Sequence, residues 1–350
     1  MNNAIFILTD RPIDIDRLHI CTWDLHGKGA FEIGIEFDLR EMTSQTDKVE
    51  FLLSLPFIGK EDKVLCLART LLTENSANCK FIFNDTVKKV ISIGDSPANG
   101  GVVEFKGREP LAILPILCSS IEDGKCVFAV ENLDKIKVDV HNAKAYIRFL
   151  IETRLEKFVV VHSGITKNSY LYDLKINEMR NMPDSINLCI NHGKYICDKI
   201  RSCFCMHVVP SDYYLTYADS NKLKNIRILE NDAFNRYLID LHALEDEYII
   251  IFQKDQTKEK DEVKSYSFFS EFEKERLGSK QIIFAVFANL FCSLIIGIFP
   301  SKITEELGHW YSNLSWGIAI AIVIVVCLFV AYYIPRKRIK RWILRKFKGV

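Results

Sequence analysis

The chain of 350 residues lacks any marked imbalance of charge. Its 46 Lys and Arg residues face 45 Asp and Glu residues, so the formal net charge is only +1. This balance excludes a whole-protein field that would draw the chain to nucleic acid. The 11 cysteines follow no framework spacing, which excludes a secreted disulfide scaffold. The apolar stretch in MNNAIFILTDRPID is too short for a secretory signal, so we expect reduced thiols in the cytosol.

Motifs that mark catalysis or phosphate binding are also missing. The sequence contains no GxxxxGK[ST], GxGxxG, GxSxG or HExxH pattern and no EF-hand loop. It has no RNP or helix–turn–helix signature either, and no duplex nucleic acid is expected as a partner. These absences leave open a small pocket for a nucleotide or oligonucleotide between β-rich subdomains.

The pattern that is present is mainly one of short strands. FEIGIEFDLR alternates, with Phe31, Ile33, Ile35 and Phe37 on one face, and similar predicted strands, among them INLCINH at 186–192, follow at short intervals. This spacing predicts a β-rich α+β region of sandwich-like or partly open barrel type. We expect two subdomains, at 1–156 and 157–252. Three stretches are predicted to be helical, namely 62–75, 142–157 and 231–247.

A charged stretch follows the β-rich region. QKDQTKEKDEVK, from Gln253 to Lys264, alternates in charge and has no apolar face, so it predicts a linker. In SFFSEFEKERL, Phe268, Phe269 and Phe272 fall at helical spacing. We therefore expect 253–280 to be a charged linker with a short helix.

Two apolar runs predict a transmembrane hairpin. The runs 281–299 and 314–334 contain no charge and are long enough to cross a hydrocarbon core of about 30 Å. A buried core helix is the alternative for the second run. The tail 335–350 is rich in Lys and Arg, which by the positive-inside rule places both termini in the cytoplasm. These patterns predict a multi-pass protein of the inner, cytoplasmic membrane.

The basic tail is either a helix lying on an anionic leaflet or a topology signal only. The cations predicted to meet the membrane surface are Arg336, Lys337, Arg338, Lys340, Arg341, Arg345, Lys346 and Lys348.

One polar residue stands out in the first apolar run. Asn289 has Ala285, Ala288 and Ser293 near it, and small neighbours permit close helix approach. An amide in hydrocarbon needs a partner, so Asn289 either lines a pore or joins helices. The alternative is a tolerated polar residue paired within its own hairpin.

The sequence offers two weak candidates for chemistry. The first is a zinc site, since zinc takes four S or N ligands. Its candidate ligands are Cys189, His192, Cys203, Cys205 and His207. Packing of one strand face in the core explains the last three equally well. The second is a nuclease-like set of Asp95, Glu104 and Lys106, for which a surface charge pair is the simpler explanation. No catalytic residue and no cofactor is assigned.

In layout, with residues 1–252 before the linker, the hairpin and the basic tail, the chain resembles bacterial anti-phage effectors. Cyclic-oligonucleotide-responsive and nucleotidyltransferase-linked, Hailong-type systems are examples. The resemblance implies a homo-oligomeric pore that depolarises the inner membrane when a nucleotide signal changes. It rests on the arrangement alone, so no residue role is carried over.

These observations favour an oligomeric membrane effector, with a pore gated by a ligand or partner protein bound to a cytosolic sensor domain. The expected partners are the lipid bilayer, further copies of the chain, and a nucleotide, oligonucleotide or protein signal. The first alternative is a membrane-anchored, metal-dependent nuclease or hydrolase, and the second is a membrane-anchored scaffold.

Overall fold

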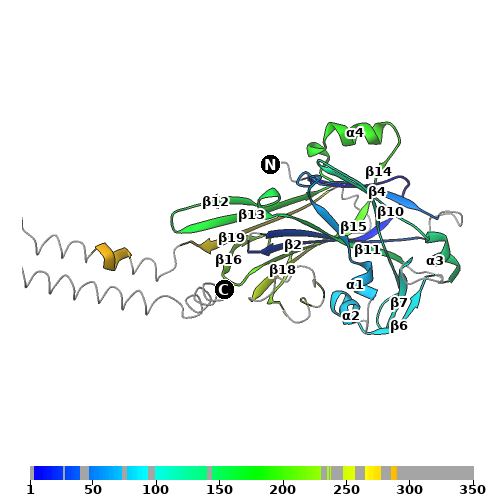
Figure 1. Ribbon diagram of the computed structural model, residues 1–350, viewed down its shortest axis with the longest axis horizontal. Helices are drawn as coiled ribbons and strands as arrows, with labels where there is room; N and C mark the ends of the chain where they lie inside the picture. The colour runs from blue at the N-terminus through cyan, green and yellow to red at the C-terminus, as the bar shows by residue number, and fades with distance from the viewer. Residues whose placement is uncertain are drawn as a thin grey trace, which may run out of the picture. The chain divides into compact units, whose positions relative to one another are not determined.

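The computed structural model describes most of the chain up to residue 276. The described residues are 4–26, 28–39, 47–72, 77–93, 99–139, 144–229, 235, 237, 247–256, 265–276 and 285–289. The chain divides into two compact units, Met1–Glu275 and Arg276–Val350. All of the described strands belong to the first unit (Figure 1).

The strands form two mixed sheets. The first sheet has the order β16 (Tyr213–Ala218), β19 (Tyr266–Glu275), β13 (Lys167–Ile176), β1 (Ala4–Thr9), β4 (Val49–Ser54), β10 (Lys125–Val130) and β9 (Leu117–Glu122), with β12 (Val160–Ser163) beside β13 and β14 (Ile196–Cys197) beside β1. The second has the order β17 (Leu223–Ile228), β18 (Tyr248–Gln256), β15 (Ile200–Pro210), β2 (Ile15–Leu25), β3 (Lys28–Phe37), β11 (Lys144–Arg154), β8 (Leu111–Leu114), β7 (Gly101–Phe105) and β6 (Val87–Ser92), with β5 (Lys63–Cys66) beside β11.

The main core lies between the inner faces of these sheets. Phe51 on β4 stacks on Phe128 of β10 at 5.1 Å between ring centroids, and both rings belong to the first sheet. They meet the second sheet through Phe37 on β3, at 5.7 Å from Phe51, and Phe149 on β11, at 5.1 Å from Phe128. The β-rich part of the predicted fold class is therefore confirmed, and the sheets pack face to face as in a sandwich.

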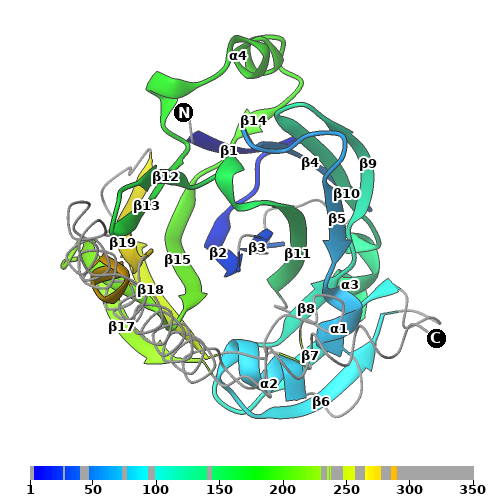
Figure 2. The ribbon, with the colours of Figure 1, turned by 60° about the vertical axis from the view of Figure 1, so that its left-hand side comes forward.

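Short helices cover the outer faces of both sheets. α4 (Asp184–Asn191) packs Ile186 against Phe6 and Leu52 of the first sheet. α1 (Ala68–Leu72) and α2 (Ala77–Phe83) cover part of the second sheet, where Leu71 joins an apolar cluster with Leu150. Figure 2 shows α4 beside β1 and β14, and α1 and α2 beside β6, β7 and β8. The remaining helical segments are α3 (Leu133–Asp139) and the 3-10 turns η3 (Leu155–Lys157) and η4 (Met179–Asn181).

The subdomain boundary expected at Glu156 falls in η3. Strands from both sides of this residue are neighbours in each sheet. β1 pairs with β13 in the first sheet, and β2 pairs with β15 in the second, both in parallel. The described strands before and after Glu156 therefore share one core.

Several local predictions are corrected. The segment 142–157, predicted as a helix, contains β11, which is buried on both faces, so no alternation of polar and apolar residues marks it. The segment 62–75 divides into β5 and α1. INLCINH, predicted as a strand, lies in α4, where Pro183 and Asp184 begin the helix. Of 231–247, only residues 235 and 237 are described as helical.

The predicted short helix after the linker is the strand β19. Its burial alternates, with Tyr266, Phe268, Ser270 and Phe272 buried and Ser267 exposed. The prediction failed because neighbouring phenylalanines satisfy both a helical and a strand period. Gln253 to Gln256 end β18, and residues 257–264 lie outside the described residues.

The predicted transmembrane hairpin is also corrected. Within the residues that the structure describes, no helix has the length and hydrophobicity needed to span a membrane. This finding overturns the hairpin in the fold class, the multi-pass inner-membrane localisation, and the membrane channel or pore. Of the two predicted spans, the structure describes only residues 285–289, which are helical. The rest of 281–299 and all of 314–350 lie outside the described residues.

Candidate functional site

The structure does not bring the zinc candidates together. Cys203, Cys205 and His207 are buried along β15, with Cys205 Sγ 3.6 Å from His207 Nε2. The Thr22 hydroxyl lies 2.8 Å from the other ring nitrogen of His207. Cys189 and His192 lie on α4 and at its carboxyl end, against the outer face of the first sheet. Throughout the described part of the chain, no group of three or more metal-binding side chains is present.

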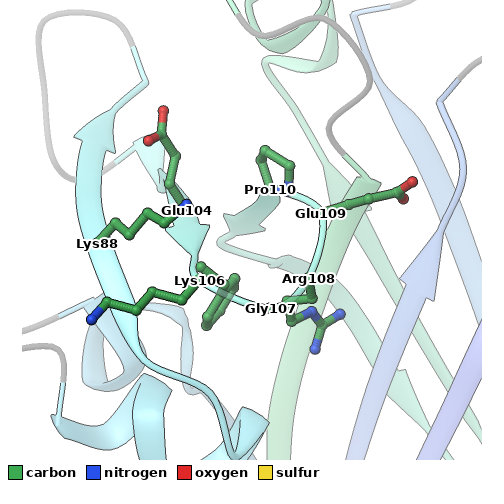
Figure 3. Close-up of a pocket in the computed structure, with 8 residues that line it drawn as sticks. Lys88, Glu104, Lys106, Gly107, Arg108, Glu109 and Pro110 are labelled. Carbon is green, nitrogen blue, oxygen red and sulfur yellow. The ribbon is translucent and has the colours of Figure 1, made fainter.

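The nuclease-like residues lie at an open pocket of about 550 Å³. Its lining is formed by Lys88, Glu104, Phe105, Lys106, Gly107, Arg108, Glu109 and Pro110. Figure 3 shows the Glu104 carboxylate and the Lys106 ammonium group pointing to different sides. Asp95 lies outside the described residues. Because the two charged groups diverge, they do not form the converging acid–lysine pair that metal-assisted phosphate hydrolysis needs.

The residues predicted to act in the membrane are described only in part. Ala285, Ala288 and Asn289 lie in the helical stretch 285–289 and are exposed. Ser293 and the eight predicted membrane-surface cations lie outside the described residues.

The strongest candidate site is on the outer face of the second sheet. Strand pairing aligns five residues there, one from each of five neighbouring strands. We call them the outer row: Lys254 on β18, Phe204 on β15, His19 on β2, Gly34 on β3 and Arg148 on β11. Neighbouring strands lie about 4.8 Å apart, so the outer row extends for roughly 20 Å.

Aromatic rings form one end of the outer row. The rings of His19 and Phe204 meet edge to face at 4.9 Å, and Phe204 stacks on Phe252 at 5.8 Å. The Lys254 ammonium group lies 5.1 Å from the centre of the Phe204 ring. Phe204, Phe252 and His19 are half-buried, so each ring leaves part of its surface open on this face.

Three cations gather around one buried carboxylate beside the outer row. Arg108 donates to Glu36 at 2.9 Å, while Arg17 and Lys144 approach the same carboxylate at 3.9 and 4.0 Å. Lys144 also pairs with the buried Asp16 at 2.6 Å. Arg201 also reaches Asp16, at 3.3 Å, and pairs with Asp14 at 2.9 Å, so these cations are matched by nearby carboxylates.

Arg17 is the most available of these cations. Its side chain is 46% exposed, and its distance of 3.9 Å from Glu36 is too long for a good hydrogen bond. Glu109 approaches Lys144 at 3.8 Å, but the Glu109 side chain is 72% exposed and water screens its charge. The group therefore exposes the Arg17 side chain while Glu36 and Asp16 stay buried.

The same positive charges act on His19. Burial, followed by the charges of Arg148, Arg17 and Arg108, lowers the pKa of His19 to about 3. The imidazole is therefore neutral at physiological pH. It can offer a ring face and a hydrogen bond, and it carries no charge of its own.

A buried network lies on the same face of the second sheet, at the Arg148 end of the outer row. The Glu32 carboxylate accepts hydrogen bonds from Arg148 Nε, from the Tyr237 hydroxyl and, at 3.1 Å, from Trp23 Nε1. Arg148 also donates to the Tyr146 hydroxyl at 2.9 Å. All five residues are at most 4% exposed. The Arg148 charge is thus held by Glu32 at the buried end of the outer row.

Gly34 makes this arrangement sterically feasible. A Cβ atom at this position would lie 2.5 Å from the Tyr146 hydroxyl oxygen. Without that atom, the hydroxyl lies over β3, within 3.4 Å of His19 Nδ1. The glycine therefore lets the buried network reach the outer row.

Comparison with known proteins adds no family to this description. No protein-family model matches the chain, and a search of curated proteins found no match.

Sequence reasoning missed the outer row. Its members come from strands that are distant in the sequence, so no local motif joins them. One signal was available, since Arg17 and His19 alternate with the buried Leu18 and Ile20 in β2. Polar side chains on a central strand of a sheet indicate that further polar groups lie on the same face and pair with them.

Proposed function

We propose that the unit formed by residues 4–275 is a binding domain for single-stranded oligonucleotides or their nucleotide units. The ligand lies on the outer face of the second sheet, along the outer row. The observation that carries the proposal is the half-buried ring pair of Phe204 and Phe252 beside the Lys254 ammonium group, with the exposed Arg17 on the neighbouring strand β2.

The aromatic rings of the site match the base of a nucleotide, and its cations match the phosphate. Every base has a flat π-face, and stacking on an aromatic side chain contributes about 1–3 kcal/mol per base. Phosphate oxygens are bound by Arg and Lys through charge-assisted hydrogen bonds. Lys254 lies beside Phe204 on β18, and Arg17 lies two residues from His19 along β2, so a stacked base would have cations near its phosphates.

A single strand fits this surface better than a duplex. Stacking on a sheet face needs bases that are free of their partners. The near-zero net charge supplies no long-range attraction of the kind on which duplex binding depends. The ligand is therefore recognised by local contacts, and its affinity changes only modestly with salt concentration.

This proposal keeps the sensor part of the resemblance to anti-phage effectors, in which a folded domain responds to a nucleotide signal. Assembly of several copies stays a prediction.

Fluorescence anisotropy with labelled single-stranded DNA and RNA tests the proposal. We expect Phe204→Ala to weaken binding by about tenfold or more, because one stacking contact contributes about 1–3 kcal/mol. The matched control is Phe269→Ala, since Phe269 is 37% exposed on the first sheet, away from the outer row. Equal affinities for the two folded variants, or no binding by the unaltered chain at micromolar concentrations, would contradict the proposal.

A further inference from the structure

We propose that Cys118 and Cys126 form a reversible disulfide when the protein meets hydrogen peroxide. Their sulfur atoms lie 4.0 Å apart on the neighbouring antiparallel strands β9 and β10. A disulfide needs the sulfur atoms to approach to about 2.05 Å. A small movement of one strand would therefore bring the two sulfur atoms to bonding distance.

A β-bulge creates this proximity. Cys118 is paired with Phe128, and Cys126 with Ile121, so the two cysteines are diagonal neighbours. The register shifts between Val127 and Phe128. Such an irregularity bends the bulged strand and re-aims its side chains. It brings Cys118 Sγ toward Cys126 Sγ across the ladder.

The position of β9 allows the remaining movement. β9 ends the strand order of the first sheet and pairs only with β10 among the described strands. An edge strand can shift without breaking a second ladder. Diagonal neighbours have Cα atoms about 7–8 Å apart, beyond the usual range for a disulfide, so the bond formed is strained. Strain makes a disulfide easier to reduce, which favours reversibility.

The two thiols have different environments and take different roles. Cys118 is exposed, whereas Cys126 is fully buried. Burial, and then the neighbouring Cys118, raises the pKa of the Cys126 thiol to about 12. Cys118 is therefore the thiol that a dissolved oxidant meets first, and Cys126 is the thiol that resolves the product.

The reaction proceeds in two balanced steps. The Cys118 thiolate attacks one oxygen of hydrogen peroxide, the O–O bond breaks, and Cys118 becomes a sulfenic acid while hydroxide leaves and takes up a proton as water. The Cys126 sulfur then attacks the Cys118 sulfur, the S–O bond breaks, and the proton of Cys126 leaves with the hydroxyl group as a second water. The two thiols are oxidised and the peroxide is reduced.

Tryptic mapping of the full chain tests the proposal. Lys125 separates the two cysteines, so cleavage gives one peptide over 109–125 and another over 126–135. After peroxide treatment and alkylation of the remaining thiols, we expect these peptides to be joined in the monomer. We also expect dithiothreitol to separate them.

Two variants make the result decisive. In Cys126→Ser the Cys118 sulfenic acid has no resolving thiol, so trapping by dimedone is expected to rise several-fold over the unaltered chain. Cys197→Ser, which changes a half-buried thiol on β14, is expected to leave the joined peptides unchanged. The proposal is overturned if a folded chain treated with peroxide gives Cys118 sulfinic acid or dimers linked through Cys118, with no link between Cys118 and Cys126.

Discussion

Replacing Arg148 with Met is expected to lower the free energy of unfolding by about 3–5 kcal/mol. Arg148 is 4% exposed and is the cation that pairs with Glu32, itself 1% exposed. Methionine fills much of the same space but leaves the Glu32 carboxylate buried without a counter-charge. The hydrogen bonds from Tyr237 and Trp23 remain, but they do not compensate a whole charge.

Urea denaturation of the single and double variants measures this effect. Adding Glu32→Gln to Arg148→Met removes the unpaired charge, so the double variant is expected to recover part of the lost stability. Arg201→Met is the matched control, because the Arg201 side chain is 56% exposed. Its effect is expected to stay within about 0.5 kcal/mol. A loss for Arg148→Met no larger than that of the control would show that the network contributes little.

The Asp198→Asn variant is expected to be more stable than the unaltered chain at pH 8, by about 2–4 kcal/mol. Burial raises the pKa of Asp198 to about 7. The hydrogen bonds from Thr9 and Ile13 lower this pKa, but their effect is smaller than that of burial. Asp14 and Asp10 raise the pKa further through their charges. The carboxyl group is thus largely ionised at pH 8 in surroundings that favour its neutral form.

The hydroxyl of Thr9 explains why the neutral form fits. This hydroxyl has one proton and two acceptors, the Arg11 carbonyl at 2.6 Å and Asp198 Oδ2. If Thr9 donates to Arg11, Asp198 must donate to Thr9 and therefore be protonated. The Oδ1 atom of Asp198 still accepts the Ile13 amide at 3.1 Å. An asparagine reproduces both hydrogen bonds without any charge.

The pH dependence has a defined sign. The pKa of Asp198 is higher in the folded chain than in the unfolded chain, where it is about 4. Its contribution to stability is therefore complete below about pH 4 and is lost as the pH rises to about 7. Cys197 beside it stays a thiol throughout, because burial raises its pKa to about 11.

Denaturation at pH 5 and pH 8 checks the Asp198 prediction. The gain from Asp198→Asn is expected to be larger at pH 8 and to shrink at pH 5. The control is Asp212→Asn, whose side chain is 60% exposed and which should show no such dependence. An Asn variant that is less stable than the unaltered chain at pH 8 would contradict the raised pKa of Asp198.

Strand periodicity predicted much of the fold. Phe31, Ile33, Ile35 and Phe37 do share the inner face of β3, as their alternation indicates. The prediction from periodicity failed where both faces of a strand are buried, as in β11, because such a strand has no polar face to mark its period.

The candidate site could not be predicted for a different reason. Strand order decides which residues become neighbours, and the outer row joins Lys254 to His19 through pairings that no local pattern specifies. The core packing of Cys203, Cys205 and His207 was foreseen as the alternative to zinc, because alternation along a strand is a local property.

The most direct test of the proposed binding site is photo-crosslinking of the full chain to a single-stranded oligonucleotide that carries 5-iododeoxyuridine, followed by tryptic mapping. The outer row predicts crosslinks in the peptide 202–222, which contains Phe204, and in the peptide 18–28, which contains His19. The peptide 265–274, which contains the exposed Phe269 of the first sheet, should carry no crosslink. Crosslinks confined to 265–274 or to other parts of the first sheet would contradict the account.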